Sequence, residues 1–390
     1  MRGQQDSYKR LNDFRETEII ISGLREAIRL EKSLCEKAAL YNKLITLLLR
    51  YGDTEFFKAN FSEFTDDFTS SVELYPVQGR DPAESETFLR NAEQIINFFP
   101  GLNEGRLPQI TEEKLLQLNK LYDTLQGDSA PSEKLRTVLY FPVIEQKDNL
   151  RICSYLETIN VRIIGSDNPT SFLIYPGENT TDPKLKKQVE KAFSAAQKLA
   201  LRGRKNDSKR YEVIVTFVNS RAEYTGDSFG LLLTLQFYLE LSRIYYPALN
   251  LRPEVNMCLT GGIDEDGKVT KIGSELINTK LEAAALSDSE YIIIPKEDHK
   301  ELGYPEYFST DGYPQRKLNI LGITSPDEIL NRRDLIVIEK KPLRRRILEA
   351  SVRHSRTVLL SVILVLLTVI FLSFRSDHNP AEVSFKNNVA

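Results

Sequence analysis

Two residues of this chain, Ser228 and Lys280, have the side chains and the local sequence that a hydrolytic dyad requires. Ser228 lies in the segment YTGDSFG (224–230), where small residues lead into an apolar stretch typical of a helix. Lys280 lies in NTKLEAA (278–284), whose alanine-rich composition predicts a later helix. A serine is a poor nucleophile until a base removes its proton, and a lysine can be that base only when it is neutral. The pair therefore predicts hydrolysis without histidine, of which the chain has only three.

The sequence around Lys280 favours a neutral amine. Desolvation must lower the pKa of a lysine from the ordinary ~10.4 towards ~7–8 before it can act as a base. The neighbours of Lys280 include Ile277, Leu281, Ala283 and Ala284, so we expect partial burial. Ser228 at a helix start would direct its own backbone N–H, and that of Asp227, towards a developing oxyanion. Each residue taken alone is more commonly a helix cap or a surface lysine.

A second arrangement of catalytic groups remains open. The residues Gly226 to Gly230 also spell Gly-x-Ser-x-Gly, the nucleophile turn of α/β-hydrolases. That turn follows a strand directly and needs a downstream acid and then a histidine, whereas a loop intervenes here. Within residues 136–335 the only histidine is His299, in a polar segment after Pro295. A Ser-His-Asp triad is therefore the weaker alternative.

No metal or cofactor is expected from the sequence. The acidic turn DEDG (264–267) lacks the spacing and the closing glutamate of an EF-hand loop, so we interpret it as a solvated turn. The three cysteines, Cys35, Cys153 and Cys258, lie far apart and form no Cys-x-x-Cys pair. This pattern predicts neither a disulfide nor a zinc site and indicates a reducing compartment.

Composition and periodicity divide the soluble part of the chain in two. With 390 residues, 41% apolar residues and a net charge of -3, the chain is long enough for several domains and shows no basic footprint for nucleic acid. Apolar residues recur at helical spacing over 17–49, 82–99 and 111–125, which predicts a helical domain over 1–130. A phenylalanine stripe within it predicts core packing, with a docking groove as the alternative: Phe56, Phe57, Phe61, Phe64 and Phe68. We expect this domain to be a recognition or regulatory module that could bind a partner.

Residues 136–335 follow a short polar linker and differ in pattern. Several segments alternate and are rich in Val, Ile and Tyr, most clearly YEVIVTFV (211–218), and predict strands. Helical patterns cover 182–201, 228–245 and 276–286. We therefore expect an α+β domain.

The segment TVLLSVILVLLTVIFLSF (357–374) carries no charge. Its 18 residues would reach about 27 Å as a helix, close to the ~30 Å hydrocarbon core of a bilayer. Basic residues are abundant before it and sparse after it, which by the positive-inside rule predicts a cytoplasmic N-terminal part. We expect a basic juxtamembrane segment (336–356), a transmembrane helix (357–374), a short external tail (375–390), and a single-pass protein of the cell membrane.

Seven short motifs follow one another in a fixed order along the α+β region. The strand 211–218 is followed by a spacer and then by Gly226-Asp227-Ser228. After these come Thr260-Gly261, Gly267-Lys268-Val269, Ile272-Gly273, Lys280-Leu281-Glu282-Ala283-Ala284 and Ile292-Ile293-Ile294-Pro295-Lys296. In this order the region 136–335 resembles the proteolytic domain of Lon protease, and most closely the membrane-bound archaeal branch.

The resemblance implies a Lon-type α+β proteolytic fold that cleaves proteins with a Ser-Lys dyad. Ser228 would be the nucleophile and Lys280 the base, Thr260 would orient Lys280, and Gly226 and Asp227 would support the oxyanion site. It also implies a homo-oligomeric ring, plausibly a hexamer. No Gly-x-x-x-x-Gly-Lys-Ser/Thr loop occurs in the sequence, so we expect a membrane-anchored endopeptidase that works without ATP. The alternative is a catalytically inactive scaffold of the same fold that binds a partner at the membrane.

Two features depart from the family pattern. Phe229 stands where the family has a small residue, so a bulky side chain is expected beside the nucleophile. About two additional residues separate Gly273 from Lys280, which predicts a wider turn over 274–277. Without that turn Lys280 would point elsewhere, and Lys271 would be a poor substitute.

Overall fold

The structure is a computed structural model. It describes residues 2–50, 54–99, 105–127, 137–147, 150–176, 182–202, 209–219, 222, 224–302, 307–310, 312–342, 344 and 363–372. By its internal contacts the chain divides into two compact units, of which the first is 1–245 with 251–338 and the second is 246–250 with 339–390. All candidate site residues belong to the first unit.

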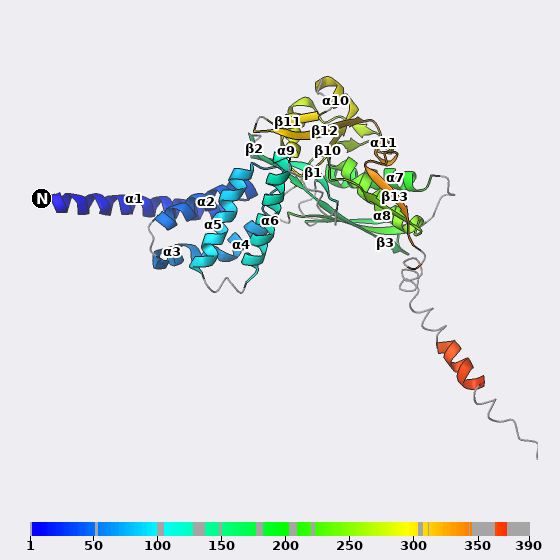
Figure 1. Ribbon diagram of the computed structural model, residues 1–390, viewed down its shortest axis with the longest axis horizontal. Helices are drawn as coiled ribbons and strands as arrows, with labels where there is room; N and C mark the ends of the chain where they lie inside the picture. Colours follow the sequence, from blue (N-terminus) through cyan, green and yellow to red (C-terminus); the bar gives the residue numbers. More distant parts are fainter. Residues whose placement is uncertain are drawn as a thin grey trace, which may run out of the picture. The chain divides into compact units, whose positions relative to one another are not determined.

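The N-terminal part of the first unit is helical (Figure 1). Its helices are α1 (Arg2–Leu30), α2 (Leu34–Arg50), α3 (Thr54–Phe61), α4 (Thr65–Leu74), α5 (Pro82–Phe98) and α6 (Arg106–Gln126), with a 3-10 turn, η1 (Ser62–Phe64). Asp81 caps α5 by accepting the N–H of Ala83, with Pro82 at the first helical position. Gly127 ends α6 in the left-handed conformation (φ 81°), which a glycine adopts without strain.

The phenylalanine stripe forms the core of this helical part. Phe57, Phe61, Phe64 and Phe68 are buried. The ring of Tyr41 from α2 makes edge contacts with Phe61, Phe64 and Phe68. The prediction of core packing is therefore confirmed, because these side chains are not available to line a groove.

The elements after the helical part combine sheets and helices; two of the strands, β6 and β13, include residues of the second unit. The largest sheet has the order β11-β12-β10-β7-β1-β2 and a smaller one the order β3-β5-β4; β8 pairs with β9, and β13 with β6. The strands are β1 (Leu139–Lys147), β2 (Leu150–Glu157), β3 (Ile159–Ser166), β4 (Ser171–Tyr175), β5 (Arg210–Phe217), β6 (Leu249–Pro253), β7 (Met257–Leu259), β8 (Gly262–Ile263), β9 (Val269–Thr270), β10 (Tyr291–Pro295), β11 (Tyr307–Thr310), β12 (Tyr313–Ile323) and β13 (Ile336–Lys340). The helices are α7 (Pro183–Ala200), α8 (Gly230–Tyr245), α9 (Ser274–Ala285), α10 (Lys296–Leu302) and α11 (Asp327–Leu330).

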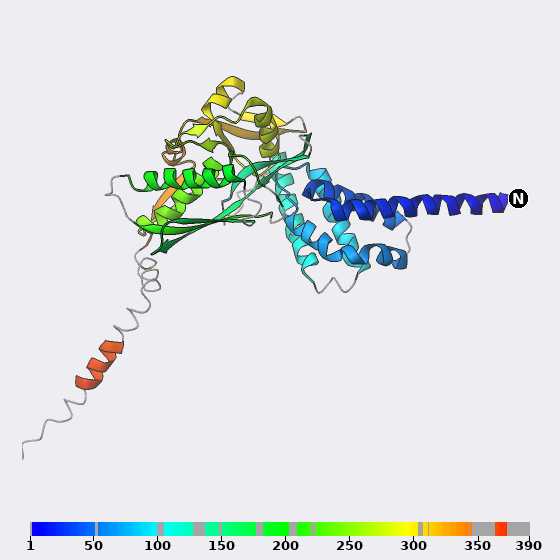
Figure 2. The ribbon, with the colours of Figure 1, turned by 180° about the vertical axis from the view of Figure 1, so that it is seen from behind.

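The large sheet places the site at the end of a central strand. β7 runs parallel to β1 on one side and to β10 on the other, and all three of its residues are buried. It ends directly before Thr260, which therefore lies at the carboxyl end of a parallel strand, where sites commonly form in such sheets. Helix α9 packs on β1 and β2 through a buried apolar face that includes Ile277, Leu281 and Ala284. Helices α7 and α8 pack against each other, and α8 contacts β3 (Figure 2).

The prediction that the cysteines stay unpaired is wrong for two of them. Cys35 of α2 and Cys153 of β2 form a disulfide across 118 residues of sequence, and Cys258 is free and buried. Spacing along the sequence did not reveal this pair because it joins the helical part to the sheet. Backbone hydrogen bonds tie the same two parts together, from Gly79 to Leu286 (2.7 Å) and from Leu156 to Gln78 (2.9 Å).

The predicted transmembrane helix is contradicted. Among the helices of the described residues, none combines the length and the apolar character needed to cross a membrane. Of the predicted span, residues 363–372 are helical, and 357–362 and 373–374 lie outside the described residues. The predicted tail (375–390) and most of the basic segment after residue 344 also lie outside the described residues.

Candidate active site

Ser228 lies in a turn immediately before α8. The helix begins at Gly230, two residues later than predicted, so Ser228 precedes it rather than opening it. Gly226 has a φ of 89°, a conformation that a side chain at this position would strain. The Ser228 side chain is half-buried, and its N–H has no acceptor among the described residues. That free N–H is a donor that an oxyanion could use.

Phe229 turns inward. Its side chain is 3% exposed and meets the ring of Phe217 edge-on, with ring centroids 5.8 Å apart. The expectation that a bulky side chain borders the Ser228 side chain is therefore wrong. Its bulk belongs to the core between β5 and α8.

The turn carrying Ser228 is fixed to the segment that follows β7. Gly261 donates its N–H to the carbonyl of Ser228 (2.7 Å), and Leu231 donates to the carbonyl of Gly261 (2.8 Å). Gly261 has a φ of 148°, and a Cβ there would lie 2.8 Å from Val269 Cγ1. A larger residue at position 261 would strain this backbone conformation and clash with the Val269 side chain, which accounts for the glycine of the Thr-Gly motif.

Thr260 links the turn that carries Ser228 to Lys280. Lys280 Nζ donates a hydrogen bond to Thr260 Oγ1 (2.9 Å), and Thr260 Oγ1 donates a longer one to the Ser228 carbonyl (3.4 Å). A threonine hydroxyl has one proton to donate and lone pairs to accept, so both bonds can exist together. Lys280 is 3% exposed and Thr260 is fully buried. The structure thus brings together Ser228, Thr260 and Lys280 from three separate segments.

The environment of Lys280 favours the neutral amine. Burial lowers the pKa of Lys280 from 10.5 to about 8. The negative charges of Asp227 and Asp298 oppose this shift. Burial raises the pKa of the Cys258 thiol, so Cys258 is uncharged at neutral pH. The expected partial burial of Lys280 is therefore exceeded, and its direct consequence is a lysine that can act as a base near neutral pH.

Helix α9 begins at Ser274, so residues 274–277 form the first turn of the helix. The wider loop predicted for these residues is therefore wrong. Gly273 is the N-cap residue with a φ of 110° and provides no side-chain cap. The carboxylate of Asp298 accepts instead the N–H groups of Ile272 (2.8 Å) and Gly273 (3.0 Å). Sequence reasoning missed Asp298 because it lies in a uniformly polar run, KEDHKE (296–301), with no distinguishing pattern.

A second buried acid, Glu157, holds the segment that precedes Ser228. Its Oε1 accepts the N–H of Asn219 (2.9 Å) and the hydroxyl of Tyr224. The ring of Tyr224 stacks on Phe217 with centroids 4.1 Å apart. Burial raises the pKa of Glu157. These contacts fix the position of the chain only a few residues before Ser228.

The rival arrangements find no support in the geometry. Lys271 is exposed and forms an ion pair with Glu301, so it is no substitute for Lys280. His299 lies on α10 and packs against Gly322 of β12. No hydrogen bond connects His299 to Ser228 in the part of the chain that the structure describes. The acidic turn connects β8 to β9, with Asp264 accepting the N–H of Lys268 (2.8 Å), as a solvated turn would.

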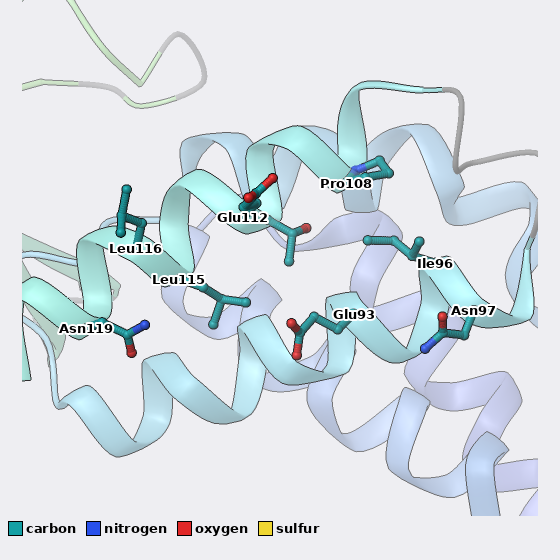
Figure 3. A pocket seen from close by; sticks show the side chains of 9 residues that line it. Glu93, Ile96, Asn97, Pro108, Glu112, Leu115, Leu116 and Asn119 are labelled. Carbon is teal, nitrogen blue, oxygen red and sulfur yellow. The ribbon is translucent and has the colours of Figure 1, made fainter.

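Other candidate binding features lie elsewhere in the fold. A groove of about 670 Å³ lies between α5 and α6, lined by Ile96, Leu115, Pro108, Glu93 and other side chains of these helices (Figure 3). Its lining includes no residue of the Ser228 site. Among the described residues, possible metal ligands gather at Cys35, Glu145 and Cys153, where the two cysteines are already joined to each other.

One contact of a working dyad is absent. Among the described residues, no hydrogen bond joins Ser228 Oγ to Lys280 Nζ. Catalytic hydrogen bonds in ligand-free enzymes are often long and tighten when substrate binds. The site therefore contains a buried lysine beside the nucleophile turn, connected to it through Thr260.

Comparison with known proteins adds no identification: no family model matches the chain, and no curated protein matches it significantly.

Proposed function

We propose that this chain is a Lon-like serine endopeptidase that works without ATP, with Ser228 as nucleophile and Lys280 as general base. The observation that carries the proposal is the buried link from Lys280 through Thr260 to the carbonyl of Ser228. Burying a lysine to this degree costs free energy, because its ammonium group loses the hydration that a surface lysine keeps. A lysine with a purely structural role would avoid this cost by staying at the surface. A buried lysine next to a half-buried serine is the arrangement that a Ser-Lys hydrolase needs.

The proposed reaction proceeds through an acyl-enzyme. Neutral Lys280 takes the proton of the Ser228 hydroxyl as Oγ attacks the carbonyl carbon of the scissile peptide bond. The charge that develops on the carbonyl oxygen is stabilised by backbone N–H groups, for which the free N–H of Ser228 is a candidate. Lys280 then gives its proton to the leaving amine. Neutral Lys280 next takes a proton from water as the water oxygen attacks the ester carbon, and it gives this proton to Ser228 Oγ as the ester C–O bond breaks. The second product then leaves with a carboxylate, and both Ser228 and Lys280 are regenerated.

The proposed substrates are unfolded or loosely structured protein segments. The sequence contains no Gly-x-x-x-x-Gly-Lys-Ser/Thr loop, so nothing in this chain supports ATP-driven unfolding. The helical part (α1–α6) is proposed to select or present substrates, or to bind a regulatory partner. A homo-oligomeric ring, a hexamer by family resemblance, belongs to the proposal on the resemblance to Lon alone.

A second candidate function is an inactive scaffold of the same fold. The observation that favours it is the missing hydrogen bond between Ser228 and Lys280. In that case the buried Lys280 would have no catalytic role, and the chain would bind a partner without cleaving it.

The test is cleavage of a denatured protein, such as denatured casein, by the purified full-length chain without ATP. We expect cleavage by the unchanged chain and its loss in both Ser228→Ala and Lys280→Ala. Lys271→Ala is the matched control, because this exposed lysine precedes α9 by only a few residues and should leave cleavage unaltered. Cleavage that persists in either dyad variant would contradict the dyad, and a chain that binds denatured casein but never cleaves it would favour the scaffold.

A further inference from the structure

Helix α10 contacts the start of α9 at two points that differ in burial. Asp298 is fully buried and accepts the N–H groups of Ile272 and Gly273. Glu301, one turn later on α10, forms an ion pair with Lys271, and both of these side chains are largely exposed (52% and 40%). The two contacts engage the same short segment before α9, so they provide a matched pair for comparison.

Asp298 supplies the cap that α9 lacks in its own sequence. A helix leaves its first N–H groups without intrahelical partners, and an acidic group near this end is favoured by the helix dipole. Gly273 at the N-cap position has no side chain to meet this need. Each carboxylate oxygen of Asp298 accepts one N–H, Oδ2 from Ile272 and Oδ1 from Gly273. Both oxygens of the buried acid are therefore used on this one segment.

The start of α9 determines where Lys280 lies. The first intrahelical hydrogen bond runs from Ile277 to Gly273 (3.2 Å), and Lys280 follows within the next turn. Lys280 lies seven positions after Gly273, a rise of about 10 Å along a helix. Because the helix behaves as a rigid segment over this distance, a shift at Gly273 moves Nζ of Lys280 relative to Thr260.

The charge of Asp298 also acts on the site. The titratable groups that face Lys280 are Cys258 from β7, Asp227 from the turn that carries Ser228 and Asp298 from α10, and the two carboxylates oppose the effect of burial on the pKa of Lys280. Asp298 in turn faces Lys271 at the start of α9. Of the two carboxylates that face Lys280, Asp298 is buried and Asp227 exposed, so the charge of Asp298 is the less screened by solvent.

We propose that Asp298 is a positioning residue of this site, whose carboxylate fixes the start of α9 and thereby holds Lys280 on Thr260. Its effect on catalysis rests on the function proposed above, whereas its effect on α9 does not. Asp298 acts through α9 and is not proposed to touch substrate.

The catalytic part of the test compares Asp298→Asn with Glu301→Gln in the full-length chain. Asparagine keeps the shape, but it removes the charge and can accept only one of the two N–H groups. We expect kcat/KM to fall by between about tenfold and about a hundredfold, the range for a misplaced catalytic group. We also expect the acid limb of the pH profile to move to lower pH, because one charge that favours the protonated lysine is lost. Glu301→Gln should change neither, and Asp298→Glu should lower the rate without moving the limb.

The structural part needs no cleavage and separates the two proposals. Hydrogen–deuterium exchange of peptides from residues 272–285 should be faster in Asp298→Asn than in Glu301→Gln, with the rest of the sheet unchanged. Unchanged exchange in α9 would overturn the positioning role, whatever the activity. Faster exchange together with cleavage that survives Ser228→Ala would uphold the positioning of α9 and refute the dyad. A rate loss with an unmoved acid limb would restrict Asp298 to the geometry of α9 and contradict its effect on the charge of Lys280.

Discussion

Lys280 Nζ lies 2.9 Å from Thr260 Oγ1, and both side chains are buried. The lysine comes from α9 and the threonine from the carboxyl end of β7, so two elements of the core meet at this hydrogen bond. A buried amine needs a polar partner, and Thr260 is the hydroxyl that supplies one here. The same hydroxyl reaches the carbonyl of Ser228, so the bond sets the relation between the proposed base and the proposed nucleophile.

Replacing Thr260 by valine removes this hydroxyl at almost constant volume. The buried amine of Lys280 then loses its acceptor, which destabilises the fold by about 1–3 kcal/mol. We expect kcat/KM on denatured casein to fall by about tenfold to a hundredfold, equivalent to ~1.4–2.7 kcal/mol in the barrier. Thermal unfolding and initial rates measure the two effects.

Thr111→Val is the matched control for this change. Thr111 is equally buried, and its hydroxyl bonds the carbonyl of Leu107 within α6 (2.7 Å). It should lower the free energy of unfolding without altering the rate of cleavage by folded protein. Equal rates for the two variants would show that Thr260 serves the fold alone.

The pH dependence of cleavage follows from the pKa of Lys280. Burial lowers this pKa to about 8, and the proposed base must be neutral. The active fraction is therefore small at acid pH and rises through pH 8, so kcat/KM should fall about tenfold per pH unit well below that value. Initial rates between pH 6 and pH 10, with stability checked at each pH, would reveal this rise of kcat/KM, the acid limb of the pH profile.

A second lysine provides the control for this profile. Burial also lowers the pKa of Lys114 to about 8, but this lysine bonds the carbonyl of Tyr75 in the helical part. Lys114→Met should leave the acid limb in place, since the titrating amine that matters is that of Lys280. A limb that disappears in Lys114→Met, or one centred near the ordinary lysine value of ~10.4, would contradict the assignment of Lys280 as the base.

The sequence motifs predicted which segments meet at the site but not how they are held there. Thr260 and Lys280 could be paired in advance because each belongs to a short motif with a fixed order along the chain. The role of Asp298 could not be predicted, because it depends on the path of α10 over the start of α9. The polar run that contains Asp298 does not reveal that path. Phe229 was misjudged for a related reason: the direction of a side chain in a turn depends on the local backbone, and here the ring packs on Phe217. The transmembrane helix expected over 357–374 was predicted from hydropathy alone, and no helix of the described residues has both the length and the apolar character for a membrane span.

The disulfide between Cys35 and Cys153 should contribute strongly to stability. It closes a loop across 118 residues, and in the chain-entropy description a loop of this length stabilises a fold by about 4–5 kcal/mol. We expect a thiol reductant such as dithiothreitol to lower the melting temperature of the unchanged chain by several degrees. Cys35→Ser and Cys153→Ser should melt at the lower temperature with or without the reductant, because neither can form the bond.

Cys258→Ser changes a buried free thiol that takes no part in the disulfide, so this variant should keep its response to the reductant. Two results together would show that the two thiols stay reduced. The melting temperature of the unchanged chain would not respond to the reductant, and iodoacetamide would alkylate both cysteines in the unfolded protein without prior reduction.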